Sequence, residues 1–301
     1  MVVGLAQTIE DAFDSIMPFD EISAALLNAG INVWNNLLSV AYALLGLNIK
    51  DFSGGAGYHL VVKVSPVFAT VGTILMLLFY FYGLYNESFE DKQFDVWGMA
   101  KSITLLSLGE FLLTNCNKIM SIILKACGGI ISTIGGGQID GLKIHADSYV
   151  PDFEAMNFGP GIGFIAVLIT LITMLVMLLC SGVIIYVVYF RYIKILICMP
   201  FAPLAISTIT GNSEVRRTSA AYLRYFCSLA LESIVIMLAL MFCNVILSGG
   251  MPELVTAMES AGWHTGDLTT VILDCFFIMF TCCLTVGSVK SAEQLASRMI
   301  G

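Results

Sequence analysis

Three carboxylic acids lie inside long apolar segments of this sequence: Glu110, Glu232 and Asp274. A charged side chain at the centre of a bilayer costs roughly 2.5–3.5 kcal/mol on insertion scales, so each acid needs a physical reason to be there. Such a group either binds protons or ions along a pathway, or it pairs with a partner inside a helical bundle. These residues are therefore the first candidates for chemistry.

Other polar residues accompany the three acids at helical spacing. At 3.6 residues per turn, three polar stripes result: Ser107, Glu110 and Thr114; Arg224, Ser228 and Glu232; and Thr270, Asp274, Thr281 and Thr285. Stripes of this kind form hydrogen bonds between packed membrane helices, or they face water in a conduit. The sequence leaves both interpretations open.

Motifs for catalysis or metal binding are missing from the sequence. The histidines His59, His145 and His264 are far apart, and no pair of cysteines has the C-x-x-C spacing of a zinc site. There is no phosphate-binding loop, no H-E-x-x-H and no G-x-S-x-G. We therefore expect no enzymatic activity, no cofactor and no metal.

The composition is that of a membrane protein. Of the 301 residues, 58% are hydrophobic and 12% are charged, and the mean hydropathy is +0.89. A soluble domain has about 25% charged residues. Backbone groups must be satisfied internally in lipid, and the alternating ten-residue strands of a membrane β-barrel are not seen. The sequence predicts an all-α, polytopic helical membrane protein.

Five segments are apolar for the roughly 20 residues that a helix needs to cross a bilayer. They lie at about 61–85, 98–122, 162–190, 225–247 and 268–289, and together they define a transmembrane domain over 59–301. Before them, residues 1–58 predict amphipathic helices at 1–17 and 20–46 that lie on a membrane or a partner.

The segment 191–210 has a different pattern. It is apolar but short, and Pro200 and Pro203 interrupt it. Proline removes a backbone donor and breaks a helix. We therefore predict a proline-broken hairpin here, re-entrant or interfacial, in place of a sixth full span.

Lysine and arginine residues predict the orientation. With five spans, nine of the fourteen share one side, and this side holds Arg191, Lys194, Arg216, Arg217 and Arg224. The bias predicts an N-terminus outside and a C-terminus in the cytoplasm. We interpret these five residues as a cytoplasmic anchor on anionic headgroups. The alternative is contact with phosphate or nucleic acid, which a net charge of −8 disfavours.

The order of these features resembles a known family. Five spans and the segment FRYIKILICMPFAPLAIST, with Arg191, Lys194, Pro200 and Pro203, are similar to the polytopic TrbL-like inner-membrane proteins of type IV secretion systems. The similarity covers residues 60–290 in topology, and it is nearest to the small versions in conjugative elements of Gram-positive bacteria. The resemblance implies a non-enzymatic channel subunit of the bacterial cell membrane. It also implies assembly with a secretion ATPase and other envelope subunits that move DNA or protein between cells.

Two functions follow as hypotheses. The first is a homo-oligomeric scaffold and translocation-channel subunit whose copies meet through the polar stripes of the second and last spans. The alternative is a solute or ion transporter that uses Glu110, Glu232 and Asp274 as coupling groups.

Overall fold

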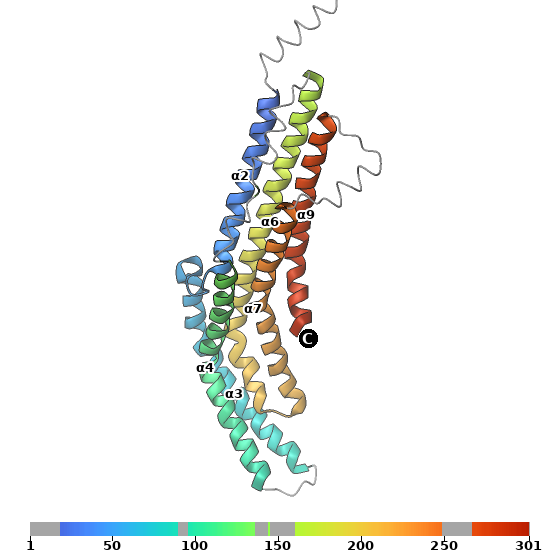
Figure 1. Cartoon of the computed structure of the whole chain (residues 1–301). Coiled ribbons are helices and arrows are strands. Elements are labelled where there is room, and N and C mark those ends of the chain that lie inside the picture. Colours follow the sequence, from blue (N-terminus) through green and yellow to red (C-terminus); the bar gives the residue numbers. More distant parts are fainter. Residues whose placement is uncertain (1–18, 90–95, 136–143, 145–159, 249–266, 301) are drawn as a thin grey trace, which may run out of the picture. The chain divides into compact units, whose positions relative to one another are not determined.

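The computed structural model describes residues 19–89, 96–135, 144, 160–248 and 267–300. In this part of the chain there are six α-helices, two short 3₁₀ helices and no strand (Figure 1). In order, they are α2 (Phe19–Gly46), η1 (Phe52–Gly55), α3 (Ala56–Phe89), α4 (Val96–Gly135), α6 (Pro160–Ser207), η4 (Thr208–Thr210), α7 (Ser213–Ser248) and α9 (Asp267–Ile300). The predicted all-α fold is confirmed. The helix predicted at 1–17 lies outside the described residues.

Five of these helices are long and apolar enough to cross a membrane, as predicted. The segments that meet this criterion are Phe52–Tyr85, Ser102–Ile134, Gly163–Thr210, Glu214–Cys243 and Ile272–Met299. Most of them extend beyond the apolar windows seen in the sequence. The 48 residues of α6 have a length of about 72 Å at 1.5 Å per residue. A hydrocarbon core is about 30 Å thick.

The proline-broken hairpin predicted at 191–210 is wrong. Residues 191–207 continue α6 without interruption, with Pro200 and Pro203 inside the helix, and the chain turns only after η4. Pro200 and Pro203 free the carbonyls of Leu196 and Met199, a loss that membrane helices tolerate where neighbouring helices pack closely. A Cβ atom on Gly72 of α3 would lie 2.9 Å from the carbonyl oxygen of Pro203, so the backbones of α3 and α6 are in contact there. Prolines are tolerated in membrane helices where neighbouring helices cover the freed backbone groups.

The chain divides into two compact units. The first contains residues 1–43, 135–187 and 236–291, and the second contains residues 44–134, 188–235 and 292–301. Helices α6, α7 and α9 each contribute residues to both units.

In the first unit, α2 is the amphipathic helix that the sequence predicts. Its buried residues recur every three or four positions: Leu27, Ile31, Trp34, Leu38 and Ala41. Gly30 lies on this face, where an added Cβ would be 3.1 Å from the sulfur of Met177 in α6. Asn35 anchors residue 144 to α2. Its amide donates to the Ile144 carbonyl at 2.8 Å and its oxygen accepts from the Ile144 N–H at 2.9 Å.

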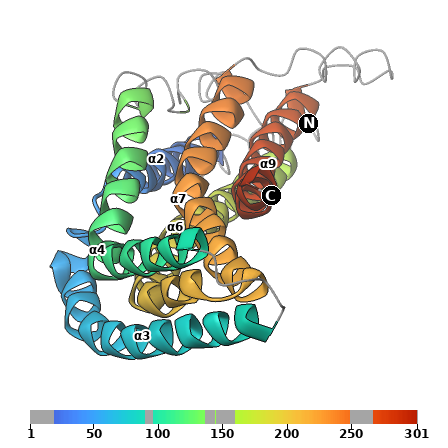
Figure 2. The ribbon, with the colours of Figure 1, turned by 90° about the horizontal axis from the view of Figure 1, so that it is seen from below.

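In the second unit, α3 and α4 pack against the C-terminal part of α6 (Figure 2). The Thr210 hydroxyl donates to the carbonyl of Met76 in α3 at 3.0 Å. At the same level, a Cβ on Gly109 of α4 would lie 3.0 Å from the Thr210 methyl group. Between α6 and α7, the Tyr222 hydroxyl donates to the Cys198 carbonyl at 2.7 Å. Small residues and hydroxyl groups therefore bring these helices together, as lipid-embedded packing requires.

Candidate functional site

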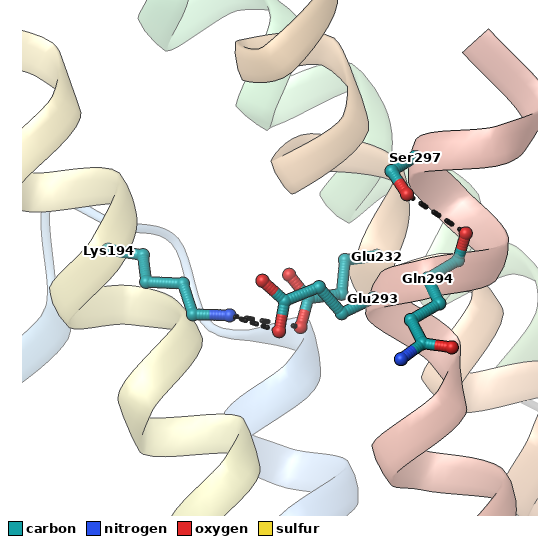
Figure 3. A network of polar contacts seen from close by, with 5 residues as sticks. All are labelled: Lys194, Glu232, Glu293, Gln294 and Ser297. Atoms are coloured by element: carbon teal, nitrogen blue, oxygen red, sulfur yellow. Dashed lines mark hydrogen bonds and ion pairs between the residues drawn. The ribbon is translucent and has the colours of Figure 1, made fainter. Parts of the chain in front are cut away.

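The second unit contains a cluster of charged side chains that three helices contribute (Figure 3). Lys194 of α6 extends toward two carboxylates, Glu232 of α7 and Glu293 of α9. Its Nζ lies 2.7 Å from Glu293 Oε2 and 4.0 Å from Glu232 Oε1. The cluster therefore joins α6 electrostatically to both other helices.

The three members of the cluster differ in their exposure to solvent or lipid. The side chain of Glu293 is 54% exposed, whereas those of Lys194 and Glu232 are 15% and 3% exposed. The second carboxylate oxygen of Glu232 is buried and has no hydrogen-bond partner among the described residues. Because an exposed carboxylate keeps much of its solvation, only Glu232 depends on its neighbours to compensate its charge.

One helical turn before Lys194, the side chain of Arg191 is also buried. Arg191 is 5% exposed, and its Nε and Nη1 atoms have no hydrogen-bond acceptor among the described residues. Its guanidinium carbon lies 4.9 Å from the centre of the Tyr192 ring, which is a cation–π contact. The guanidinium stays charged in proteins, so this contact and the nearby Glu232 carboxylate must stabilise a permanent charge.

Tyr192 connects this region to the end of α2. Its hydroxyl donates to the carbonyls of Leu44 and Leu47, where α2 ends and the Leu44 carbonyl also accepts from the Leu47 N–H at 3.0 Å. Its ring stacks on Phe52 of η1 at a centroid distance of 4.5 Å. These contacts fix the position of α6 next to the turn between α2 and α3.

A small cavity borders Arg191. Its volume is about 20 Å³, and residues of α4, α6, α7 and the 45–49 segment line it. The space matches about one water molecule. Apart from Arg191, Tyr192 and Ser233, the lining consists of Gly128 and aliphatic side chains: Leu45, Leu47, Ile49, Leu124, Ile131 and Ile195.

The predicted polar stripe of α4 lies on the outside of the second unit. Ser107, Glu110 and Thr114 are exposed, whereas the buried residues of α4 include Leu113 and Met120 on the other side of the helix. The Thr114 hydroxyl donates to the backbone carbonyl of Glu110 at 2.8 Å. This stripe therefore makes no contact with the interior of its own unit.

The predicted stripe of α9 has the opposite environment. Thr281 and Thr285 are buried in the first unit, and Asp274 is half-buried. Their hydroxyl groups donate to carbonyls one turn back, at 2.9 Å for Thr281 and 2.7 Å for Thr285. Thr270 lies in α9, but its side chain is outside the described residues. Burial of the two threonines favours a role in packing helices of the same chain.

Three of the five predicted anchor residues are exposed on α7: Arg216, Arg217 and Arg224. Arg216 donates from Nε to the carbonyl of Ile209 at 3.1 Å, so it caps the end of η4. The other two predicted anchor residues, Arg191 and Lys194, are instead part of the buried region described above. The structure therefore does not support a contact between these two residues and lipid headgroups.

Glu293 and Tyr192 were not singled out from the sequence. The sequence holds a signal for Glu293, because the apolar residues Val289, Ala292 and Ala296 recur at helical spacing, and the structure buries all three. This pattern extends the last span past residue 289 and places Glu293 on a structured helix. Tyr192 gives no comparable signal, because its partners are backbone carbonyls 145 and 148 residues away.

The fold and this interior charge cluster define a multi-pass α-helical membrane protein. No group of three or more metal-binding side chains occurs in the described part of the chain. A comparison of the sequence with models of known protein families found no match, and neither did comparisons with curated proteins and with solved structures.

Proposed function

We propose that this chain is a non-enzymatic membrane subunit of a conjugative type IV secretion machine, where it serves as scaffold and part of the translocation path. The observation that carries the first half of this proposal is the exposed polar stripe of α4. Glu110, with Ser107 and Thr114, lies on the outer face of a helix apolar enough to span a membrane. A carboxylate that faced lipid would cost several kcal/mol, so another protein surface or water covers this face.

The covering surface is proposed to be a second copy of the chain or another subunit. Polar and small residues associate helices in lipid, where hydrophobicity provides no driving force. Helix α3, next to α4, exposes large apolar side chains such as Val67, Ile74 and Phe81, which suit lipid contact. Helix α4 also exposes apolar side chains, such as Ile103 and Ile122, so the support for an assembly face comes from its polar stripe and not from the rest of the helix.

The parts of this proposal that concern the cargo and the secretion machine rest on the family resemblance of the segment with Arg191, Lys194, Pro200 and Pro203. A single bundle of five helices encloses too little space for a DNA strand, so a conduit must be shared among copies or partners. We therefore include a secretion ATPase and other envelope subunits among the proposed partners, with DNA or protein in transient contact. The proposed location is the bacterial cell membrane.

Glu110→Leu tests the assembly face. It is expected to reduce the oligomer seen by native mass spectrometry in detergent and to lower transfer in a mating assay. Glu110→Gln keeps a hydrogen-bonding group and should have a milder effect. Phe111→Leu is the matched control, because its side chain is exposed on the same helix and carries no polar group. Assembly and transfer at wild-type level in Glu110→Leu would rule out this face.

The proposed orientation has the N-terminal segment outside and the C-terminus in the cytoplasm. Single cysteines at Asn28 and Ser297, both exposed positions, can be introduced into a background without other cysteines. An impermeant thiol reagent added to intact cells should label position 28 and not position 297. The reverse labelling would overturn the orientation.

The transporter alternative is supported by one observation, the buried Glu232 carboxylate with an unpartnered oxygen. Glu232 is buried and Glu110 is exposed within the same unit, so these two acids do not form one binding site. Purified protein in liposomes provides the test. Solute- or ion-dependent flux from this protein alone, lost in Glu232→Gln, would favour transport.

A further inference from the structure

The outer surface of α3 has the pattern of a helix in contact with the hydrocarbon core of a bilayer. After Lys63, this helix contains no charged residue until Glu87. Its exposed side chains in between include six large apolar ones: Val67, Val71, Ile74, Leu77, Leu78 and Phe81. The exposed Tyr82 lies about 28 Å from Lys63 along the helix axis, a hydrocarbon core is about 30 Å thick, and tyrosine is enriched at membrane–water interfaces. This pattern places Lys63 at one edge of the core.

Two contacts fix the register between α3 and α4, which run antiparallel in the second unit. A Cβ atom on Gly72 of α3 would lie 3.3 Å from a methyl carbon of Leu113 in α4. Further toward the start of α3, the side-chain amide of Asn117 donates to the Ser65 hydroxyl at 2.5 Å. Lower numbers along α3 therefore correspond to higher numbers along α4.

This register brings lysines of both helices to one level. Lys63 lies about 3 Å beyond the Asn117–Ser65 hydrogen bond, and Lys118 lies about 1.5 Å beyond it in the same direction. Lys125 is two helical turns further along α4, on the same face as Lys118. Lys50 precedes α3, and its Nζ lies 5.4 Å from the centre of the Tyr58 ring, about 7 Å beyond Lys63 along α3.

The four lysines lack carboxylate partners. Their side chains are all exposed. The ion pairs of the described residues join Lys194 to its two acids, so none of these four lysines is paired in the part of the chain that the structure describes. Along α4, Glu110 is about 12 Å from Lys118, too far for an ion pair. The start of α3 and the adjoining part of α4 therefore present an excess of positive charge at the edge of the apolar surface.

We propose that Lys50, Lys63, Lys118 and Lys125 bind the phosphate groups of anionic phospholipids, such as phosphatidylglycerol, at one surface of the membrane. A lysine at the edge of the core keeps its methylene groups in apolar surroundings while its ammonium group reaches the headgroups. Each lysine near an anionic surface contributes about fivefold to the affinity. The lysines lie beyond the α4 polar stripe, so headgroups at this level are compatible with a protein partner at Glu110. The surface depends neither on the secretion function nor on the orientation of the chain.

The first experiment titrates the purified full-length protein in detergent with phosphatidylglycerol or phosphatidylcholine and counts bound lipid by native mass spectrometry. We expect the wild type to prefer phosphatidylglycerol. Lys63→Gln/Lys118→Gln should weaken this binding by about 25-fold, which is fivefold for each lysine. Lys63→Arg/Lys118→Arg is the matched control, because it keeps both charges and should keep the affinity. No preference in the wild type, or an unchanged affinity in the glutamine variant, would overturn the proposal.

The same titration separates phospholipid from other anionic ligands. Sodium phosphate and sodium chloride at equal ionic strength should weaken lipid binding equally, because both salts screen the lysines. A stronger effect of phosphate would assign the lysines to a soluble phosphate compound and contradict the proposal. Loss of an oligomer in the glutamine variant, with phosphatidylglycerol binding at the wild-type level, would show that the lysines contact a protein instead.

A second measurement tests the level of the lysines with all four in place. Leu60→Cys and Val71→Cys, at exposed positions of α3, each receive a nitroxide label in a background without other cysteines. In vesicles of phosphatidylcholine and phosphatidylglycerol, a water-soluble nickel chelate should relax the label at position 60, near the headgroups. The label at position 71, about 12 Å inward from Lys63, should respond to oxygen and not to nickel. Equal depths of the two labels would refute the lysine level and the proposal with it.

Discussion

Replacing Lys194 by methionine is expected to destabilise the protein far more than replacing Glu293 by glutamine, although both changes remove the same 2.7 Å ion pair. The difference follows from burial. Glu293→Gln leaves Lys194 next to Glu232, and a half-exposed ion pair contributes less than about 1 kcal/mol. Lys194→Met leaves Glu232 buried, 4.0 Å from where its cation was, and no other ion pair in the described part of the chain includes this carboxylate. Breaking a buried pair from one side costs about 3–5 kcal/mol.

The free energy of unfolding can be measured in detergent micelles by titration with dodecyl sulfate, followed by far-ultraviolet circular dichroism. The double variant Lys194→Met/Glu232→Leu should be more stable than Lys194→Met alone by about 0.5–3 kcal/mol, the usual size of coupling between contacting residues. If Lys194→Met costs no more than Glu293→Gln, the buried carboxylate is neutral or solvated and this reasoning is refuted.

Two further pairs of variants test the packing by the same unfolding measurement. Tyr192→Phe removes a hydroxyl that donates to two carbonyls and should cost about 1–2 kcal/mol, whereas Tyr42→Phe should be neutral or stabilising by about 1 kcal/mol because it removes a buried, unpartnered hydroxyl. Burial raises the pKa of Tyr42, so this hydroxyl is neutral during the unfolding measurement and its removal changes no charge. A larger cost for Tyr42→Phe than for Tyr192→Phe would contradict the hydrogen bonds of Tyr192 and the lack of one at Tyr42. Gly72→Ala should destabilise by about 1–3 kcal/mol, because the new Cβ would lie 2.9 Å from the Pro203 carbonyl. Gly129→Ala meets nothing within 4 Å and should stabilise α4 by about 0.5–1 kcal/mol; equal effects of the two alanines would refute the close approach at Gly72.

Hydropathy predicted the number and approximate positions of the membrane helices, because lipid requires long apolar helices with all backbone groups paired. Helix ends were less predictable. The last helix continues to Ile300, through a segment in which Glu293 and Ser297 are exposed and only Ala292 and Ala296 are buried. An average of hydropathy along the sequence falls where polar and apolar residues begin to alternate in this way, so it places the end of the helix too early.

The proline rule misled the prediction at 191–210. Proline usually breaks a helix, but membrane helices tolerate it inside a packed bundle, and the backbone of α3 packs against the second proline, Pro203, at Gly72. The candidate site was predictable only in part. Lys194 and Glu232 were both singled out, for different reasons, but helical periodicity gives the face of a residue and not its partner on another helix. Their pairing follows from tertiary packing.

The position of Gly30 in α2 has a consequence for biosynthesis. Its close neighbours, Met174 and Met177, leave the ribosome roughly 130 residues after α2 is complete, a delay of about 7–26 s at 5–20 residues per second. The last helix of the same unit follows later still. Throughout this interval, the face of α2 around Gly30 lacks the two methionines that cover it in the finished fold. An insertion factor that shields α2, and a protease that removes chains in which it stays uncovered, would therefore both act before the fold is complete.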